Sequence, residues 1–223
     1  MSSEKANDLQ VEEAGSDRPT SPVGPKAYPS RIANPAPAGI FSFASTTFML
    51  SMYNVNVRGV HEPNVVVGMA IFTGGLLQFM AGMWEFPRGN VFGATAFSSY
   101  GCFWMSYATI FIPASGILAA YDNDPQGLRN ALGIYLVTWF MVTFLFALVC
   151  IRKNNSFVIL LSVLTIAFIL LASAEFTGKA VLTKAGGVFG IITALIAYYI
   201  GFSEMLSAER RPIGRLPIGA WDS

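Results

Sequence analysis

Long apolar runs recur along this 223-residue chain, and they constrain its fold more than any other feature. Each run is about 20 residues long, the length that an α-helix needs to cross the hydrocarbon core of a bilayer. A closed β-barrel would need short segments of alternating polarity, and the sequence has none. It therefore predicts an all-α integral membrane protein, a bundle of six transmembrane helices. The expected helices cover about 39–57, 64–85, 91–113, 128–150, 156–174 and 186–206.

The composition excludes several classes of function. Only 12% of the residues are charged, about half the share of a soluble domain. A net charge of +1 gives no basic field for nucleic acid. No GxxxxGK[ST] phosphate loop is present, and one histidine with two cysteines cannot build an ordinary metal site. The sequence therefore predicts no enzyme, cofactor, metal or nucleic-acid partner.

The ends of the chain differ from its middle. Residues 1–33 are polar and partly acidic, so we expect a disordered tail, and 207–223 a second, C-terminal tail. No secretory signal peptide is apparent. Of the fourteen Lys and Arg residues, only Arg58, Arg129, Lys179 and Lys184 fall on the far side of the predicted bundle. The positive-inside rule then places both tails in the cytoplasm, and we expect the plasma membrane.

Small residues indicate where helices approach each other closely. Gly186, Gly190 and Ala194 recur every four residues, and Ala70 and Gly74 have the same spacing. Such stripes let helix backbones meet in a membrane. They fit either packing within the bundle or a seam between protomers.

A proline-rich motif precedes the first expected helix. Asn34, Pro35, Pro37 and Gly39 form the string NPAPAG, in which the prolines suit a first helical turn and Asn34 suits a cap. This string resembles the signature of the acetate uptake transporter (GPR1/FUN34/YaaH) family. Further motifs agree with it: Gly74-Gly75 with Gln78 and Glu85, the run from Gly89 to Trp104, Gly201 to Glu204, and Leu216 to Gly219.

The resemblance implies a six-helix protomer with its own pore, assembled as a homo-hexamer. It also implies transport of acetate and related short carboxylates, with succinate or ammonia handled by some members. The family's constriction of a Phe, a Tyr and a Leu corresponds here to Phe43, Tyr100 and Leu164. All three lie two to three turns into their helices, roughly 12–14 Å from the membrane face at 1.5 Å per residue, so they can form a ring.

The charge of a carboxylate would find no fixed cation in mid-membrane, because no Lys or Arg lies at the centre of an expected helix. Polar side chains must meet it instead, and Tyr100 is expected to donate a hydrogen bond to it. The expected substrate-binding or pore-lining residues are Thr47, Asn54, Gln78, Ser98, Ser99, Trp104 and Thr165. Glu85, Glu175 and Glu204 stand at helix ends, and Glu85 is the preferred candidate for proton coupling.

Transport of acetate or a related short monocarboxylate is thus the predicted function, with succinate as a further candidate. The pathway is either channel-like or proton-coupled. Two alternatives stay open. The aromatic residues of the third expected helix would also suit an ammonia or ammonium exporter. The polar N-terminal tail would suit a membrane sensor of acetate.

Overall fold

The computed structural model describes residues 32–151 and 154–219 of the chain, and every regular element in these ranges is helical. The long helices are α1 (Ala36–Asn54), α4 (Val91–Phe111), α5 (Pro125–Cys150), α6 (Asn155–Thr177) and α7 (Ala180–Ala208). Short 3-10 turns lie in the connections, η1 (Val57–Gly59), η3 (Pro113–Ser115) and η4 (Ala119–Tyr121). The N-terminal tail expected at 1–33 lies almost wholly outside the described residues.

One further helix is built from three parts. α2 (Val66–Gly68) continues into η2 (Met69–Leu77), which is a π-helix, and then into α3 (Gln78–Glu85). The widened segment contains Gly74, where an added Cβ would lie 2.7 Å from Thr46 Oγ1 and 2.8 Å from the Trp104 ring. π-segments are frequent at functional sites. At Gly74, this one is approached closely by both α1 and α4.

In the part of the chain that the structure describes, four helical spans are long and apolar enough to cross a membrane: Val66–Glu85, Pro125–Cys150, Asn155–Thr177 and Ala180–Ala208. The arrangement with six spans, which also needs α1 and α4, remains a prediction.

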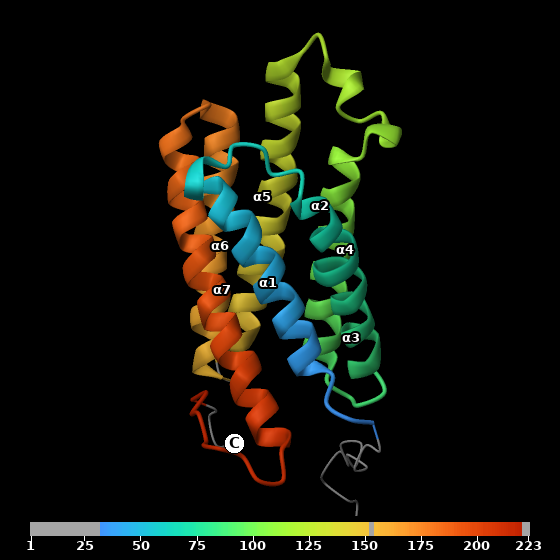
Figure 1. Ribbon diagram of the computed structural model, residues 1–223, viewed down its shortest axis with the longest axis vertical. Helices are drawn as coiled ribbons and strands as arrows, with labels where there is room; N and C mark the ends of the chain where they lie inside the picture. Colours follow the sequence, from blue (N-terminus) through green and yellow to red (C-terminus); the bar gives the residue numbers. More distant parts are fainter. Residues whose placement is uncertain (1–31, 152–153, 220–223) are drawn as a thin grey trace, which may run out of the picture.

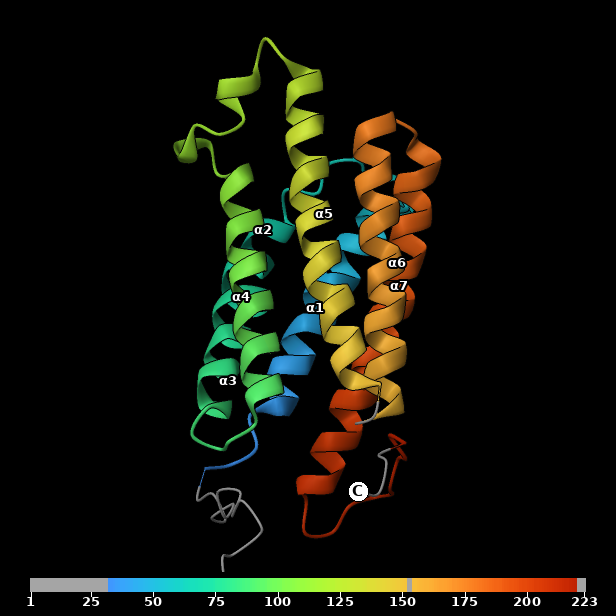
Figure 2. The same cartoon turned by 180° about the vertical axis from the view of Figure 1, so that it is seen from behind.

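The helices stand nearly side by side around a central axis (Figures 1 and 2). α1 crosses obliquely and packs on α7, α5 packs on α6, and α6 on α7. α4 packs against η2 and α3 on the other side. Both ends of the described chain lie at the lower end of the molecule in Figure 1, and the 112–124 connection projects at the opposite end.

Several expected helix boundaries were wrong, because apolar runs and helices end for different reasons. α1 begins three residues early, since its prolines fit the first turn. It ends at Asn54, before Asn56 turns left-handed with φ 55°. Asp124 accepts from Gly127 N at 2.8 Å and starts α5 early. α6 extends to Thr177, where Gly178 caps it with φ 69°.

α7 differs most from the expected range 186–206, since it covers Ala180–Ala208. Its small-residue stripe is used inside the chain. A Cβ on Gly186 would meet the Leu171 side chain of α6, and one on Gly190 would meet Ser51 Oγ of α1. The stripe therefore packs helices of one chain together, and it gives no support for a seam between protomers.

The segment after α7 folds back on the bundle. Ser203 Oγ donates to the Leu216 carbonyl at 2.6 Å, and Tyr199 OH donates to that of Pro217 at 2.7 Å. The backbone N–H of Asn155 donates to the Gly219 carbonyl at 3.0 Å. Part of the expected C-terminal tail thus binds α7 and the start of α6.

Candidate functional site

Three cavities follow one another along the axis of the bundle. The distal cavity, about 300 Å³, lies at the end away from the described termini, between α1, α4, α5, α6 and α7. The middle cavity is about 30 Å³, and the proximal cavity, about 340 Å³, lies at the other end. Phe43 and Tyr100 line both the distal and the middle cavity. Phe92 and Phe97 line both the middle and the proximal one.

The narrow part of this row is formed by buried rings. The centroids of Phe43 and Tyr100 are 5.6 Å apart, and Leu164 lines the distal cavity beside them. All three side chains are at most 6% exposed. A middle cavity of this size holds water but no larger molecule. We call Phe43, Tyr100 and Leu164 the waist.

Tyr100 is held by a partner that the sequence reasoning missed. Its hydroxyl lies 2.9 Å from Thr143 Oγ1 of α5, and either atom can donate. Thr143 is fully buried. This bond fixes the Tyr100 ring across the axis, and the Tyr100 hydroxyl can donate to a carboxylate only when Thr143 is the donor of the bond. The one signal in the sequence was a hydroxyl inside an otherwise apolar stretch of α5.

Above the waist the wall of the distal cavity is aromatic. The Phe103 ring lies 5.0 Å from both Trp104 and Trp139, in edge-to-face contact. It stacks on Tyr107 and Tyr135 at about 6 Å. Trp104 had been expected to line the path, whereas Phe103 and Tyr135 had not. Such rigid rings keep the cavity open and give it an apolar surface.

Four buried polar atoms have no hydrogen-bond partner among the described residues, and each belongs to a residue that lines a cavity. Thr47 Oγ1 and Trp104 Nε1 belong to the distal cavity, Gln78 Oε1 to the middle one and Glu85 Oε1 to the proximal one. A buried polar group without a partner is costly. Groups of this kind at every level of one path indicate that a polar solute or water meets them there.

The structure places the expected lining residues differently. Thr47, Asn54 and Trp104 line the distal cavity, and Gln78 the middle one. Ser98, Ser99 and Thr165 line none of the three. Ser98 Oγ donates to the Ala94 carbonyl and Thr165 Oγ1 to that of Leu161, both at 2.6 Å. The Ser98 and Thr165 hydroxyls thus bond to their own helices, and a pore-lining role of the three residues stays a prediction.

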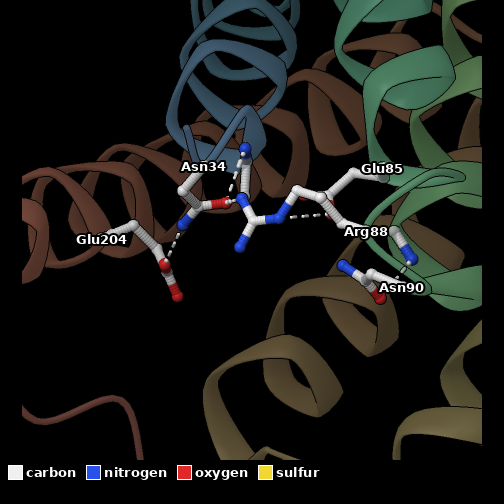
Figure 3. A network of polar contacts seen from close by, with 7 residues as sticks. Asn34, Glu85, Arg88, Asn90 and Glu204 are labelled. Carbon is white, nitrogen blue, oxygen red and sulfur yellow. Dashed lines mark hydrogen bonds and ion pairs between the residues drawn. The ribbon is translucent and has the colours of Figure 1, made fainter. Parts of the chain in front are cut away.

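A charged network lines the proximal cavity (Figure 3). Asn34 Nδ2 donates to Glu204 Oε2 at 3.0 Å, and Arg88 Nη1 donates to Asn34 Oδ1 at 2.7 Å. Arg88 Nε lies 4.0 Å from Glu85 Oε2. Glu85 itself is only 1% exposed. Asn34 thereby ties the start of α1, the end of α7 and the α3–α4 connection together around the cavity.

The rest of the proline-rich motif shapes the same end. Pro35 precedes α1 directly, and Asn34 Oδ1 accepts from the Ala36 N–H at 3.2 Å. Pro37 is buried in the first turn. A Cβ on Gly39 would lie 2.9 Å from the Phe97 ring, so the glycine makes room for a wall residue of the path.

A profile described as the GPR1/FUN34/yaaH family matches residues 19–215. The chain belongs to this family. Within the family it is 47% identical over 179 residues to Ammonia transport outward protein 2 of Saccharomyces cerevisiae; this covers 80% of the chain and 64% of the yeast protein. It is 33% identical over 193 residues to the Succinate-acetate/proton symporter SatP of Escherichia coli, covering 85% of the chain and 97% of SatP.

A solved structure of the family agrees with the fold. The bacterial acetate channel SatP superposes with a TM-score of 0.74 at 32% identity, covering 85% of this chain and all of the channel. With four membrane-length helices and these relatives, the GPR1/FUN34/yaaH chain is a multi-pass membrane protein.

Arg88 was the functional candidate most clearly missed, and its signal was a spacing of three residues from Glu85.

Proposed function

We propose that the chain carries acetate and related short carboxylates, succinate among the candidates, across the membrane along the row of three cavities. The observation that supports this best is the set of four buried, unpartnered polar atoms distributed along that row. The names of the two SatP relatives, an acetate channel and a succinate-acetate/proton symporter, agree with the proposal. Six transmembrane helices, including α1 and α4, would surround the path.

The waist would act as the selectivity barrier of this pore. Phe43 and Leu164 offer no hydrogen bond, and the Tyr100 hydroxyl is paired with Thr143. A narrow apolar constriction excludes water and ions by dewetting. A charged group at the centre of a bilayer costs about 2.5–3.5 kcal/mol even on the lenient scale. The neutral acid avoids this cost, so proton-coupled passage suits the waist better than passage of the anion.

Below the waist, Glu85 would take over the proton. The acid's O–H bond breaks as a bond forms to the unpartnered Glu85 Oε1, and the resulting carboxylate pairs with Arg88 of the same cavity. Thr47, Asn54, Gln78 and Trp104 would contact the cargo on its way. The proton then leaves Glu85 towards the solvent at this end of the bundle, and the cargo follows as an anion.

Replacing Glu85 with Gln tests this role. We expect exchange of labelled acetate across liposomes at equal pH to persist, because exchange needs no net proton transfer. Net uptake driven by a pH gradient should fall at least tenfold relative to the wild type, once the leak of empty liposomes has been subtracted from both. Glu209→Gln, at an exposed position near the same end, should change neither. An equal loss of both activities would argue for a structural role of Glu85.

Export of ammonia or ammonium is the second candidate. The proximal cavity is lined by two carboxylates, Glu85 and Glu204, against one guanidinium, Arg88. The distal cavity combines aromatic rings with Glu175, which suits a small cation. One yeast relative carries ammonia transport in its name.

A panel of cargoes in liposomes separates these functions. Labelled acetate, succinate and methylammonium are offered at external pH 5 and pH 7 to the purified protein and to empty liposomes. We expect acetate uptake above the leak of empty liposomes, faster at pH 5. Methylammonium flux without acetate flux would support the exporter instead.

We also propose a plasma-membrane location with both termini in the cytoplasm, and assembly as a homo-hexamer. The orientation rests on the Lys and Arg distribution in the sequence, and the large exposed apolar surface would face lipid and neighbouring protomers. Light scattering of the detergent-solubilised protein should give six times the 24.1 kDa chain mass. A monomeric mass would contradict the hexamer.

A further inference from the structure

Glu175 is the only acidic residue that lines the distal cavity in the described part of the chain. It lies near the C-terminal end of α6, among the Tyr107, Tyr135 and Phe168 rings of the same wall. None of the Lys and Arg residues within 32–151 and 154–219 lines this cavity. A solute that enters from the distal end therefore passes a carboxylate in an aromatic chamber before it reaches the waist.

The charge of Glu175 is not neutralised by a close ion pair. Within the described residues the one pair with N–O distance up to 4.0 Å joins Arg88 and Glu85 at the other end. Arg129 of α5 is the basic group that faces Glu175, but its guanidinium lies against Gly178 at the α6 terminus. There it meets the negative end of the helix dipole.

The remaining ionisable groups around Glu175 are few. Tyr107 of α4 and Tyr135 of α5 share the cavity wall with it. On the α7 side, Lys179 and Lys184 are exposed and do not line the cavity. His61 lies in a neighbouring cavity at the mouth, bonded through Nδ1 to Asn56 at 3.1 Å. Among the described residues that line the distal cavity, Glu175 is thus the one side chain that can carry a full negative charge at neutral pH, and Arg129 acts on it from outside the lining.

We propose that Glu175 makes the distal cavity a charge filter, which admits a short carboxylic acid in its neutral form and turns back the carboxylate anion. The inference rests on the proposed transport function and adds a residue that sets the charge state of the cargo at entry. A carboxylate confined beside a second carboxylate in surroundings of low dielectric is repelled far more strongly than in water. The neutral acid meets no such repulsion, and it can donate its O–H to Glu175.

The filter predicts how uptake depends on external pH. A short carboxylic acid titrates near the value of a Glu side chain, about 4.3. Its neutral fraction therefore falls roughly 80-fold from pH 5 to pH 7. Uptake through the wild-type protein should fall by a comparable factor at constant total acetate, because the anion that remains cannot pass the chamber.

Glu175→Gln tests the filter by removing the charge and keeping the shape. Uptake of labelled acetate is measured at pH 7 in a Tyr100→Ala background, in which the waist no longer excludes the anion. The liposomes have a positive interior potential, set by a potassium gradient and valinomycin, which drives the anion inwards. We expect Glu175→Gln to raise the flux of this background at least fivefold, and Glu175→Asp to leave it unchanged. Asp122→Asn, an exposed charge in the 112–124 connection, controls for surface charge and should change nothing.

The outcomes separate the filter from transport itself. If the wild type shows no acetate uptake above empty liposomes at pH 5, the proposed function fails. If it does transport at pH 5, and Glu175→Gln leaves the anion flux at pH 7 unchanged in well-folded protein with the Tyr100→Ala waist, the filter is overturned.

Discussion

Replacing Tyr100 with Ala should open the barrier to ions that the wild-type protein excludes. The ring packs against Phe43 and lines both the distal and the middle cavity, so its removal joins the two cavities into one wettable space. We measure chloride flux into liposomes in a Glu175→Gln background, so that the distal filter does not limit it. Adding Tyr100→Ala should raise this flux at least tenfold, because a hydrated constriction no longer excludes charge by dewetting.

The control for this variant is Tyr100→Phe. It keeps the ring and removes only the hydroxyl that bonds to Thr143, at a typical cost of about 1 kcal/mol for a lost hydrogen bond. In the same Glu175→Gln background, its chloride flux should stay within about twofold of that of the parent protein. A Tyr100→Ala protein in this background that keeps its thermal stability and still excludes chloride would show that the barrier lies elsewhere.

Replacing Gly82 with Val should prevent the protein from folding. A Cβ at this position would lie 2.5 Å from the Ser98 backbone nitrogen and 3.0 Å from the Ala94 carbonyl oxygen. Overpacking a core usually costs about 1–3 kcal/mol. Here the obstacle is backbone, which has no rotamer to change, so α3 and α4 must separate and we expect a cost at or above the upper value.

The measurement is the yield of monodisperse protein in detergent together with its melting temperature. Gly68→Val provides a matched control in the same helix, because a Cβ there meets nothing within 4 Å, and it should leave both unchanged. If Gly82→Val gave normal yield and melting temperature, the close approach of α3 and α4 would be wrong.

The sequence predicted the waist better than it predicted the charged network. Phe43 and Tyr100 lie at equal depth on helices that run the same way, and this follows from the helical rise alone. The contact between Arg88 and Asn34 joins residues far apart in the sequence. No local pattern encodes it, because it depends on how α1, α3 and α7 converge.

Side-chain direction is a second feature that the sequence pattern does not encode. Ser98, Ser99 and Thr165 were expected to line the path because they are polar inside apolar helices. A serine or threonine in a helix can donate to its own backbone instead, as Ser98 and Thr165 do. The spacing of glycines likewise does not show which helix packs against them. Gly186 and Gly190 proved to face α6 and α1 of the same chain.

Acetate uptake by a protein with a plugged waist is the most direct test of the account as a whole. Leu164→Trp places a larger side chain beside Phe43 and Tyr100, whereas Ile166→Trp adds the same bulk on the exposed face of α6. Both variants are reconstituted at equal amounts, after thermal melting has shown that they are folded. We predict that Ile166→Trp transports acetate like the wild type and that Leu164→Trp falls to the leak of empty liposomes. Wild-type flux through folded Leu164→Trp would contradict a path through the waist.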